Sequence, residues 1–241
     1  MKLLILNILM MMGAGDVSQK DTINLEKAQI DQVYTQYKES TLTHRRFKQE
    51  EVFQLIRKHR SNPSFKIEEI GKSTQQREIY RVAFGDGKKK VMLWSQMHGD
   101  EATATMALFD LFNFLEGKDD GFDAIRDLLK KETSLYFIPM LNPDGAELFQ
   151  RRTAMNIDMN RDARAGKTVE GALLKFQAMS LKPHYAFNLH DQNIYYNVPN
   201  TKNPVAISLL APAFNIARDI NPVREGAMQI IAGMNRLLVQ Y

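Results

Sequence analysis

The 241-residue chain contains no cysteine, so it can form neither a disulfide nor a thiolate metal site. Any metal ion would have to be bound by histidine, aspartate or glutamate. A strong excess of one charge is also missing, since 32 basic residues face 28 acidic residues and the net charge is +4. We therefore predict no nucleic-acid partner, because nucleic-acid-binding proteins usually carry a clustered basic face. With 44% hydrophobic and 25% charged residues, the composition excludes collagen-like, coiled-coil and wholly disordered chains.

The apolar stretch near the N-terminus is too short to span a membrane. It runs from Leu3 to Met12 and holds about ten residues, whereas roughly 20 are needed for a spanning helix. We therefore predict no permanent membrane anchor. A preceding lysine and the small residues Gly13 to Gly15 make residues 1–15 resemble a secretory signal peptide, which predicts export to the periplasm or the extracellular space. A frayed apolar N-terminus is the alternative.

The rest of the chain alternates between helical and extended patterns. After a polar lead-in at residues 16–46, we predict one domain over residues 47–241 with no interdomain linker or repeat. The predicted helices cover residues 49–60, 102–115, 122–131, 172–181, 205–218 and 222–239, and the predicted strands cover 65–67, 79–84, 91–94, 135–138 and 185–189. Gly85-Asp86-Gly87 between two strands predicts a hairpin. This alternation predicts an α/β fold with helices on both faces of a sheet.

The segment that carries most chemical information contains His98 and Glu101, at the point where a buried strand gives way to a helix. Side chains three residues apart at a helix start face the same side. An imidazole and a carboxylate placed in this way can bind one divalent ion and leave positions for a third ligand and a water. Taken alone the pattern is weak, because a helix-start histidine beside a surface glutamate gives the same spacing.

A further histidine, His190, directly follows the predicted strand at residues 185–189. Side chains at the ends of neighbouring strands converge where α/β sheets keep their sites. Two histidines and one glutamate with an open fourth position form a catalytic zinc set, although the same set also suits iron. We interpret the other histidines as structural: His44 and His59 in basic surface stretches, and His184 in a loop.

A polar segment at residues 150–162 follows the sequence Asn142-Pro143-Asp144-Gly145. Its arginines offer a rigid fork that binds a carboxylate through two hydrogen bonds. A neighbouring asparagine can donate a further hydrogen bond to the same anion. A solvated loop remains the alternative for this segment taken by itself.

Four motifs in this order resemble the zinc carboxypeptidase family, the carboxypeptidase A-like metallopeptidases: His98-x-x-Glu101, Asn142-Pro143-Asp144-Gly145, Asp158-x-Asn160-Arg161 and Asn188-Leu189-His190. The resemblance runs from about Phe47 to the C-terminus. It implies a three-layer α/β/α fold with a mixed, mostly parallel central sheet. It also implies one zinc ion per chain, peptide or protein C-termini as substrates, and hydrolysis of the C-terminal peptide bond.

The resemblance assigns expected roles to individual residues. The implied zinc ligands are His98, Glu101 and His190. Asp158 would accept a hydrogen bond from His98, Asn160 and Arg161 would bind the C-terminal carboxylate of a peptide, and Arg151 would polarise the scissile carbonyl. Arg152 is adjacent to Arg151, so the choice between these two arginines stays open.

The catalytic glutamate of the family has no clear counterpart. In the family it lies well beyond the third zinc ligand, but only 51 residues follow His190 and the single glutamate among them is Glu225. Glu225 begins a predicted surface helix and is a poor candidate for the general base. We therefore expect that the C-terminal part of the domain is missing, and that the chain binds zinc and a carboxylate but hydrolyses peptides poorly.

Two other functions remain open at this point. Deacylases of the succinylglutamate desuccinylase and aspartoacylase group use a similar zinc site on N-acyl amino acids, although Asn142-Pro143-Asp144-Gly145 and Asp158-x-Asn160-Arg161 favour the peptidase. Without a general base, the chain could also be a non-catalytic zinc-containing module that binds peptide ends. The sequence does not indicate an oligomeric state or the preferred C-terminal residue.

Overall fold

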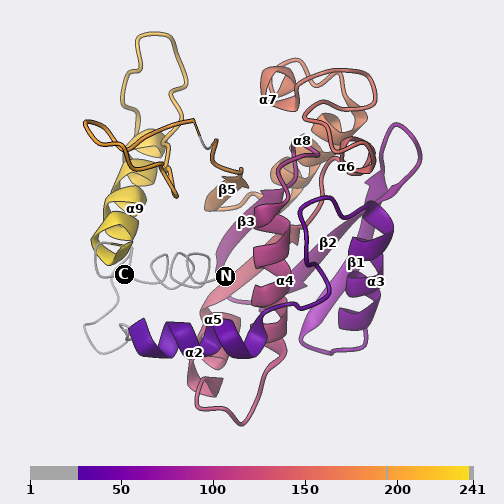
Figure 1. Cartoon of the computed structure of the whole chain (residues 1–241), viewed down its shortest axis with the longest axis vertical. Helices are drawn as coiled ribbons and strands as arrows, with labels where there is room; N and C mark the ends of the chain where they lie inside the picture. Colours follow the sequence, from indigo (N-terminus) through magenta and orange to yellow (C-terminus); the bar gives the residue numbers. More distant parts are fainter. Residues whose placement is uncertain (1–26, 194, 239–241) are drawn as a thin grey trace. The chain divides into compact units, whose positions relative to one another are not determined.

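The computed structural model describes residues 27–193 and 195–238 (Figure 1). The predicted signal peptide and the first part of the lead-in lie outside the described residues. The helices are α2 (Lys27–Tyr37), α3 (Gln49–His59), α4 (Thr103–Glu116), α5 (Asp123–Glu132), α6 (Pro143–Glu147), α7 (Met159–Asp162), α8 (Val169–Leu181) and α9 (Pro222–Leu238). The strands are β1 (Phe65–Lys72), β2 (Glu78–Phe84), β3 (Lys89–Ser95), β4 (Thr133–Ile138) and β5 (Tyr185–Leu189).

The chain divides into two compact units. One comprises Gln36–Asp191 and contains the whole sheet, while the other gathers described residues up to Thr35 and from Gln192 onward. The predicted lead-in from Gln36 onward thus belongs to the sheet-containing unit, where Glu39 and Leu42 are buried. None of the described helices is long and apolar enough to cross a bilayer.

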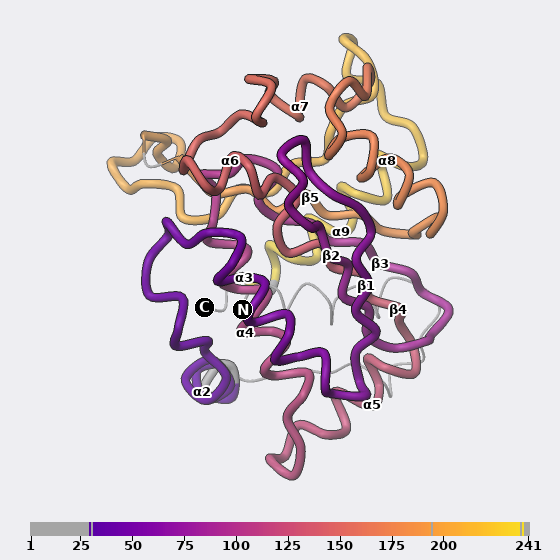
Figure 2. Tube along the Cα trace, turned by 90° about the vertical axis from the view of Figure 1, so that its right-hand side faces the viewer, coloured from indigo at the N-terminus to yellow at the C-terminus, as the bar shows by residue number. Residues whose placement is uncertain are grey.

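The five strands form one sheet in the order β1-β2-β4-β3-β5. β1 pairs with β2 and β2 with β4 in antiparallel fashion, whereas β3 pairs with both β4 and β5 in parallel. The β1–β2 hairpin can be followed in Figure 2. The α/β class and the mixed sheet are confirmed. The pairs divide evenly between the two directions, however, where the family resemblance implied a parallel majority.

The hairpin predicted around Gly85-Asp86-Gly87 is wrong, because β4 lies between the two strands that the turn connects. The turn binds the start of β4 instead: the amides of Asp86 and Gly87 donate to the carbonyls of Lys130 and Thr133, both at 3.1 Å. Gly85 has φ +76°, and a Cβ on Gly87 would lie 2.0 Å from the carbonyl carbon of Glu132. The glycines therefore allow the turn to pack closely against the start of β4, and they do not form a tight hairpin.

Helices cover both faces of the sheet, as the alternating pattern predicted. Neighbouring residues of β4 point to opposite faces. Phe137 contacts Phe112 of α4, with ring centroids 5.2 Å apart, while Ile138 belongs to a core cluster against which Leu173 and Leu174 of α8 pack. α4 and α8 thus form the outer layers of a three-layer arrangement.

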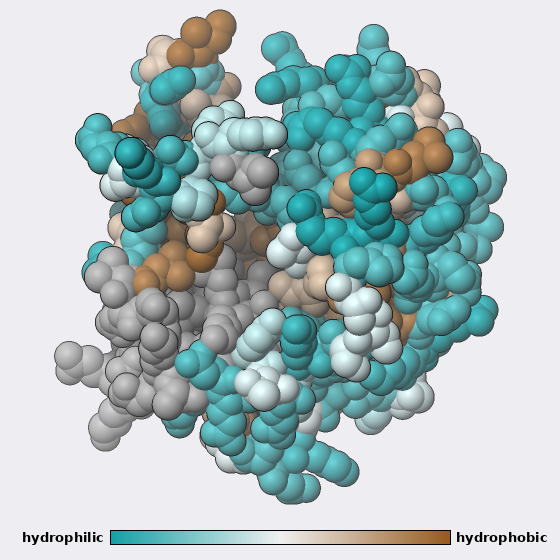
Figure 3. Space-filling model, in the orientation of Figure 1, coloured by the Kyte–Doolittle hydropathy of each residue, from teal (hydrophilic) through white to brown (hydrophobic). Residues whose placement is uncertain are grey.

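The helix predicted at residues 49–60 is confirmed as α3, which buries Val52, Leu55 and Ile56. In Figure 3 the right-hand edge of the molecule, beside α3, is mostly hydrophilic. The surface location predicted for His59 is wrong, because its side chain is fully buried and its Nδ1 lies 2.8 Å from Glu116 Oε1. The basic neighbours of His59 in the sequence point outward while the histidine occupies the apolar face of the helix.

The helix predicted at residues 205–218 is also wrong, because this segment has no regular secondary structure. Pro212 lies in its middle, where proline removes a helical hydrogen bond and biases the preceding residue toward an extended conformation. The apolar side chains that suggested the helix are exposed, among them Leu210 and Ile216. The next predicted helix is present as α9.

Replacing Gly87 by alanine should destabilise the fold, since the new Cβ would meet the backbone of Glu132 and Thr133 at 2.0 and 2.2 Å. We expect a loss of about 1–3 kcal/mol in the free energy of unfolding, the range for overpacked sites. Urea unfolding of the two proteins measures this loss. Lys88→Ala, an exposed neighbour in the same turn, should change stability by less than about 0.5 kcal/mol. Equal effects of the two substitutions would contradict this account.

Candidate metal centre

The loop that carries His98 and Glu101 is supported by the segment that follows β4. The amide of Asn142 donates to the carbonyl of Gln96 at 2.9 Å, so pairing continues past the ends of β3 and β4. The Asn142 side chain accepts from the amide of Gly145 at 2.9 Å and thereby caps α6. A Cβ on Gly99 would lie 2.1 Å from the carbonyl carbon of Gly145. Glycine is therefore needed for the two backbones to approach this closely.

Gln96 stabilises the same loop from inside. It is buried and has φ +45°, a left-handed conformation that residues other than glycine rarely adopt. Its amide nitrogen donates to the carbonyl of Gly99 at 3.0 Å, and its oxygen accepts from the hydroxyl of Thr105 at 2.8 Å. Gln96 was not among the functional residues predicted from the sequence. Its position just before the motif was the available signal, but the conformation of its backbone cannot be seen in the sequence.

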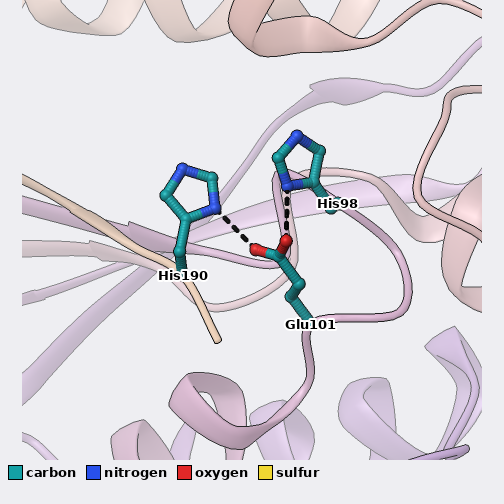
Figure 4. A group of neighbouring side chains, drawn as sticks. All are labelled: His98, Glu101 and His190. Atoms are coloured by element: carbon teal, nitrogen blue, oxygen red, sulfur yellow. Dashed lines mark hydrogen bonds and ion pairs between the residues drawn. The ribbon is translucent and has the colours of Figure 1, made fainter. Parts of the chain in front are cut away.

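The structure brings His98, Glu101 and His190 together, as Figure 4 shows. His98 Nδ1 lies 2.8 Å from one carboxylate oxygen of Glu101, and His190 Nδ1 lies 2.5 Å from the other. One potential ligand atom from each of the three residues lies within 4.8 Å of the others. Among the described residues this is the one such group of three or more metal-ligating side chains.

The environment of Glu101 favours the charged carboxylate. Burial alone would raise the pKa of this side chain, but hydrogen bonds with His190 and His98 outweigh burial and lower the pKa from 4.5 to about 2. The carboxylate is therefore ionised throughout the physiological pH range and available as an anionic ligand.

Asp158 lies on the far side of the His98 ring. Its Oδ1 is 3.1 Å from His98 Nε2 and also accepts from the amide of Asn160 at 3.0 Å, which caps α7. Burial raises the pKa of Asp158, but these hydrogen bonds and the charge of Arg151 lower it overall. With a cation at His98 Nδ1, an ionised Asp158 would accept the proton of Nε2 and hold the ring in that tautomer.

Of the two neighbouring arginines, Arg151 reaches the cluster. Its Nη1 lies 3.0 Å from His98 Nδ1 and 2.9 Å from Glu101 Oε1, and its Nε donates to Asp158 Oδ2 at 3.1 Å. Arg152 instead donates to the backbone carbonyl of Asn156 at 3.0 Å. Arg151 is thus the arginine of the pair that contacts the predicted metal ligands, and its role in polarising the scissile carbonyl stays a prediction.

The two residues implied for carboxylate binding differ in the structure. The Asn160 amide nitrogen lies 3.3 Å from His190 Nε2, and its oxygen accepts from Asn188 at 3.4 Å. The side chain of Arg161 is exposed and forms no hydrogen bond or ion pair with the described residues. The structure therefore brings Asn160 to the cluster but not Arg161, whose role stays a prediction.

The residues present fit a divalent metal ion. Two imidazole nitrogens and one carboxylate oxygen are the donor set of catalytic zinc sites. His98 Nδ1 and Glu101 Oε1 already contact one positive group, the guanidinium of Arg151. The partner of the other His98 nitrogen, Asp158, is of the kind that orients metal-binding histidines.

Comparison with known proteins identifies the family. The sequence profile described as zinc carboxypeptidase matches residues 53–193, so the chain belongs to the zinc carboxypeptidase family. Carboxypeptidase D of Mus musculus is 27% identical over 162 residues, which cover 58% of this chain and 12% of that protein. Carboxypeptidase SOL1 of Arabidopsis thaliana is 34% identical over 68 residues, which cover 27% of this chain and 13% of that protein. The chain thus spans a small part of these relatives.

Solved structures show the same fold. A metallo-carboxypeptidase from Burkholderia cenocepacia aligns with a TM-score of 0.57 and 21% identity, covering 61% of this chain and 41% of that one. A metallo-carboxypeptidase from Pseudomonas aeruginosa, solved with (2-guanidinoethylmercapto)succinic acid, aligns with a TM-score of 0.54 and 23% identity, covering 61% and 40%. These likenesses confirm the predicted α/β fold of the family.

Glu101 should make the metal-free protein acid-sensitive. Because folding lowers its pKa, the ionised carboxylate stabilises the fold above about pH 4.5, and this contribution is lost as pH falls toward 2. In chelator-treated protein, the free energy of unfolding should therefore fall less between pH 5 and pH 3 in Glu101→Gln than in the wild type. Urea unfolding at both pH values measures the difference. Glu50→Gln, an exposed glutamate of α3, should follow the wild type, and a parallel fall in all three proteins would refute the prediction.

Proposed function

We propose that this chain is a zinc-dependent metallocarboxypeptidase, which hydrolyses the C-terminal bond of peptides. The observation that carries the proposal is the cluster of His98, Glu101 and His190 with the donors of Arg151 and Asn160 beside it. Membership of the zinc carboxypeptidase family and the names of the relatives support the same activity.

His98, Glu101 and His190 would hold the zinc ion through two nitrogens and one oxygen. When bound, zinc supplies Lewis-acid chemistry: it polarises a carbonyl and acidifies a water molecule. Asp158 keeps the proton of His98 on Nε2 and so leaves Nδ1 free to act as a ligand.

Arg151 and Asn160 would bind the substrate. The Arg151 side chain is 44% exposed, so a peptide can reach its guanidinium, which would stabilise negative charge on the scissile carbonyl oxygen. The Asn160 amide nitrogen, held by the contact of its oxygen with Asn188, would donate to the terminal carboxylate of the peptide. Only a chain end offers this carboxylate, which would make the enzyme an exopeptidase.

The two carboxylates of the cluster are not free to act as the general base. Both oxygens of Glu101 face the histidines, and Asp158 lies beside His98 Nε2 and accepts from Asn160 and Arg151. Glu225 is exposed in the first turn of α9. We therefore expect zinc and peptide ends to bind well and hydrolysis by this chain to be slow.

The protein should bind one zinc ion per chain through the three predicted ligands. His190→Ala removes one of them and should lower the bound zinc to near zero after removal of excess metal. Elemental analysis measures the content. His184→Ala, an exposed histidine at the opposite end of β5, should keep the full equivalent. Full zinc content in His190→Ala, or none in the wild type, would refute the proposed site.

Binding of a peptide should depend on its free C-terminal carboxylate and on Asn160. Calorimetric titration of the zinc-loaded protein should show tighter binding of an N-blocked dipeptide than of its C-terminal amide. Asn160→Ala should weaken binding of the free acid by roughly 10- to 100-fold, which corresponds to one hydrogen bond to a charged group. Arg152→Gln is the control, because Arg152 faces the backbone of Asn156.

The same preparations separate the competing functions. Release of the C-terminal residue from the dipeptide supports the peptidase. Cleavage of an N-acyl amino acid with no peptide cleavage would support the deacylase instead. Tight binding of the free acid without cleavage of either compound would identify a peptide-end-binding module.

A further inference from the structure

Arg45 belongs to a segment that precedes the residues 53–193 matched by the family profile. The sequence predicts a polar lead-in over residues 16–46. The structure fixes it against the sheet-containing unit on both sides of the arginine, because Leu42 is 3% exposed and Phe47 is 1% exposed. The Arg45 side chain therefore extends from an anchored stretch of backbone.

One nitrogen of Arg45 contacts both segments that supply the predicted zinc ligands. Its Nη2 donates to the carbonyl of Asp100, between His98 and Glu101, at 3.2 Å. The same nitrogen donates to Asp191 Oδ2, in the residue after His190, at 2.5 Å. The two ligand segments come from distant parts of the chain, and the guanidinium joins them at this point.

Asp191 adds further contacts to this connection. Its carboxylate accepts from the backbone amide and the hydroxyl of Thr103, both at 3.1 Å, at the first residue of α4. Its own amide donates to Glu101 Oε2 at 3.4 Å. The Asp191 side chain is 9% exposed. The residue that follows His190 is thus fixed to the helix that follows Glu101.

We infer that Arg45 is a positioning residue of the metal centre, which holds the His190 segment against the His98–Glu101 loop through Asp191 and Asp100. This inference rests on the proposed zinc site. It adds a third chain segment to that site. The side chains of Arg45 and Asp191 form no hydrogen bond with the side chains of His98, Glu101 or His190 in the described part of the chain, so both act by placing the backbone and not as ligands.

The direction in which Arg45→Gln changes zinc affinity distinguishes a positioning role from a purely electrostatic effect of the charge. A positive charge near a cation site opposes binding of the cation. If Arg45 acted only through its charge, Arg45→Gln would strengthen zinc binding. If Arg45 positions the ligands, the same substitution weakens zinc binding because the two ligand segments are no longer joined.

We expect Arg45→Gln to weaken zinc binding by roughly 10- to 100-fold, as is typical for partners outside the ligand set. Competition with a chromophoric chelator measures zinc affinity, and the visible absorption of the cobalt-substituted protein reports the geometry of the ligands. The matched control is Arg46→Gln, which removes the same charge one residue later. Arg46 is exposed and lies over the ring of Phe149 at 4.6 Å. This control should keep the affinity and the cobalt spectrum of the wild type.

A second substitution tests the connection without a change in charge. Thr103→Val removes the hydroxyl donor to Asp191 and should weaken zinc binding by roughly 10-fold, whereas Thr103→Ser keeps the donor and should retain wild-type affinity. Thermal melting of the metal-free proteins identifies any variant that does not fold, and the Thr103 pair then decides the question.

The outcomes separate this inference from the proposed function. A wild-type protein that binds no zinc would overturn the proposed site and this inference with it. A wild type that binds zinc, together with an Arg45→Gln protein that binds it equally well or more tightly, would overturn the inference and leave the proposed site intact. Equal weakening by Arg45→Gln and Arg46→Gln would also overturn it.

Discussion

The structure of the site depends on one carboxylate placed between two imidazoles. Glu101 contacts a histidine from its own loop with one oxygen and a histidine that lies 89 positions later with the other. Burial would favour a neutral side chain, yet the hydrogen bonds keep it charged. The two imidazoles and the carboxylate, which water would otherwise solvate separately, are thus held together. The surrounding chain has to keep them in this arrangement.

The backbone around this point is specialised for close approach. A Cβ on Gly99 would meet the backbone of Gly145, whereas a Cβ on Gly145 would meet the side chain of Asn142 and the carbonyl of Arg152, so neither position has room for a side chain. Asp144, beside Gly145, is buried and accepts from Ser73 and Arg77 at 2.6 and 2.8 Å. The Asn142-Pro143-Asp144-Gly145 sequence, which carried no chemistry of its own in the sequence analysis, thus connects the metal-site loop to the β1–β2 turn.

The sequence predicted the α/β class, the core helices and the grouping of His98, Glu101 and His190, because these features depend on local periodicity and on residue types with restricted chemistry. It failed where the outcome depends on distant partners. The turn at Gly85 and Gly87 has the composition of a hairpin, but the strand inserted beside it comes from residues 133–138. His59 has basic neighbours, but its own side chain lies on the apolar face of α3. Nothing in the residues around Arg45 indicates that Asp191 is its partner.

The strand order has a consequence for the time at which the site can form. β3, which leads to His98, pairs only with strands that come later in the chain, and Val91 lies opposite Tyr185 of β5. During synthesis on the ribosome, most of the 36–191 unit has to emerge before His190 becomes available to His98. Pairing over such a long separation is slow compared with local folding. A metal ion could therefore bind all three predicted ligands only after β5 has paired with β3. Until then a nascent chain would lack His190 at the site.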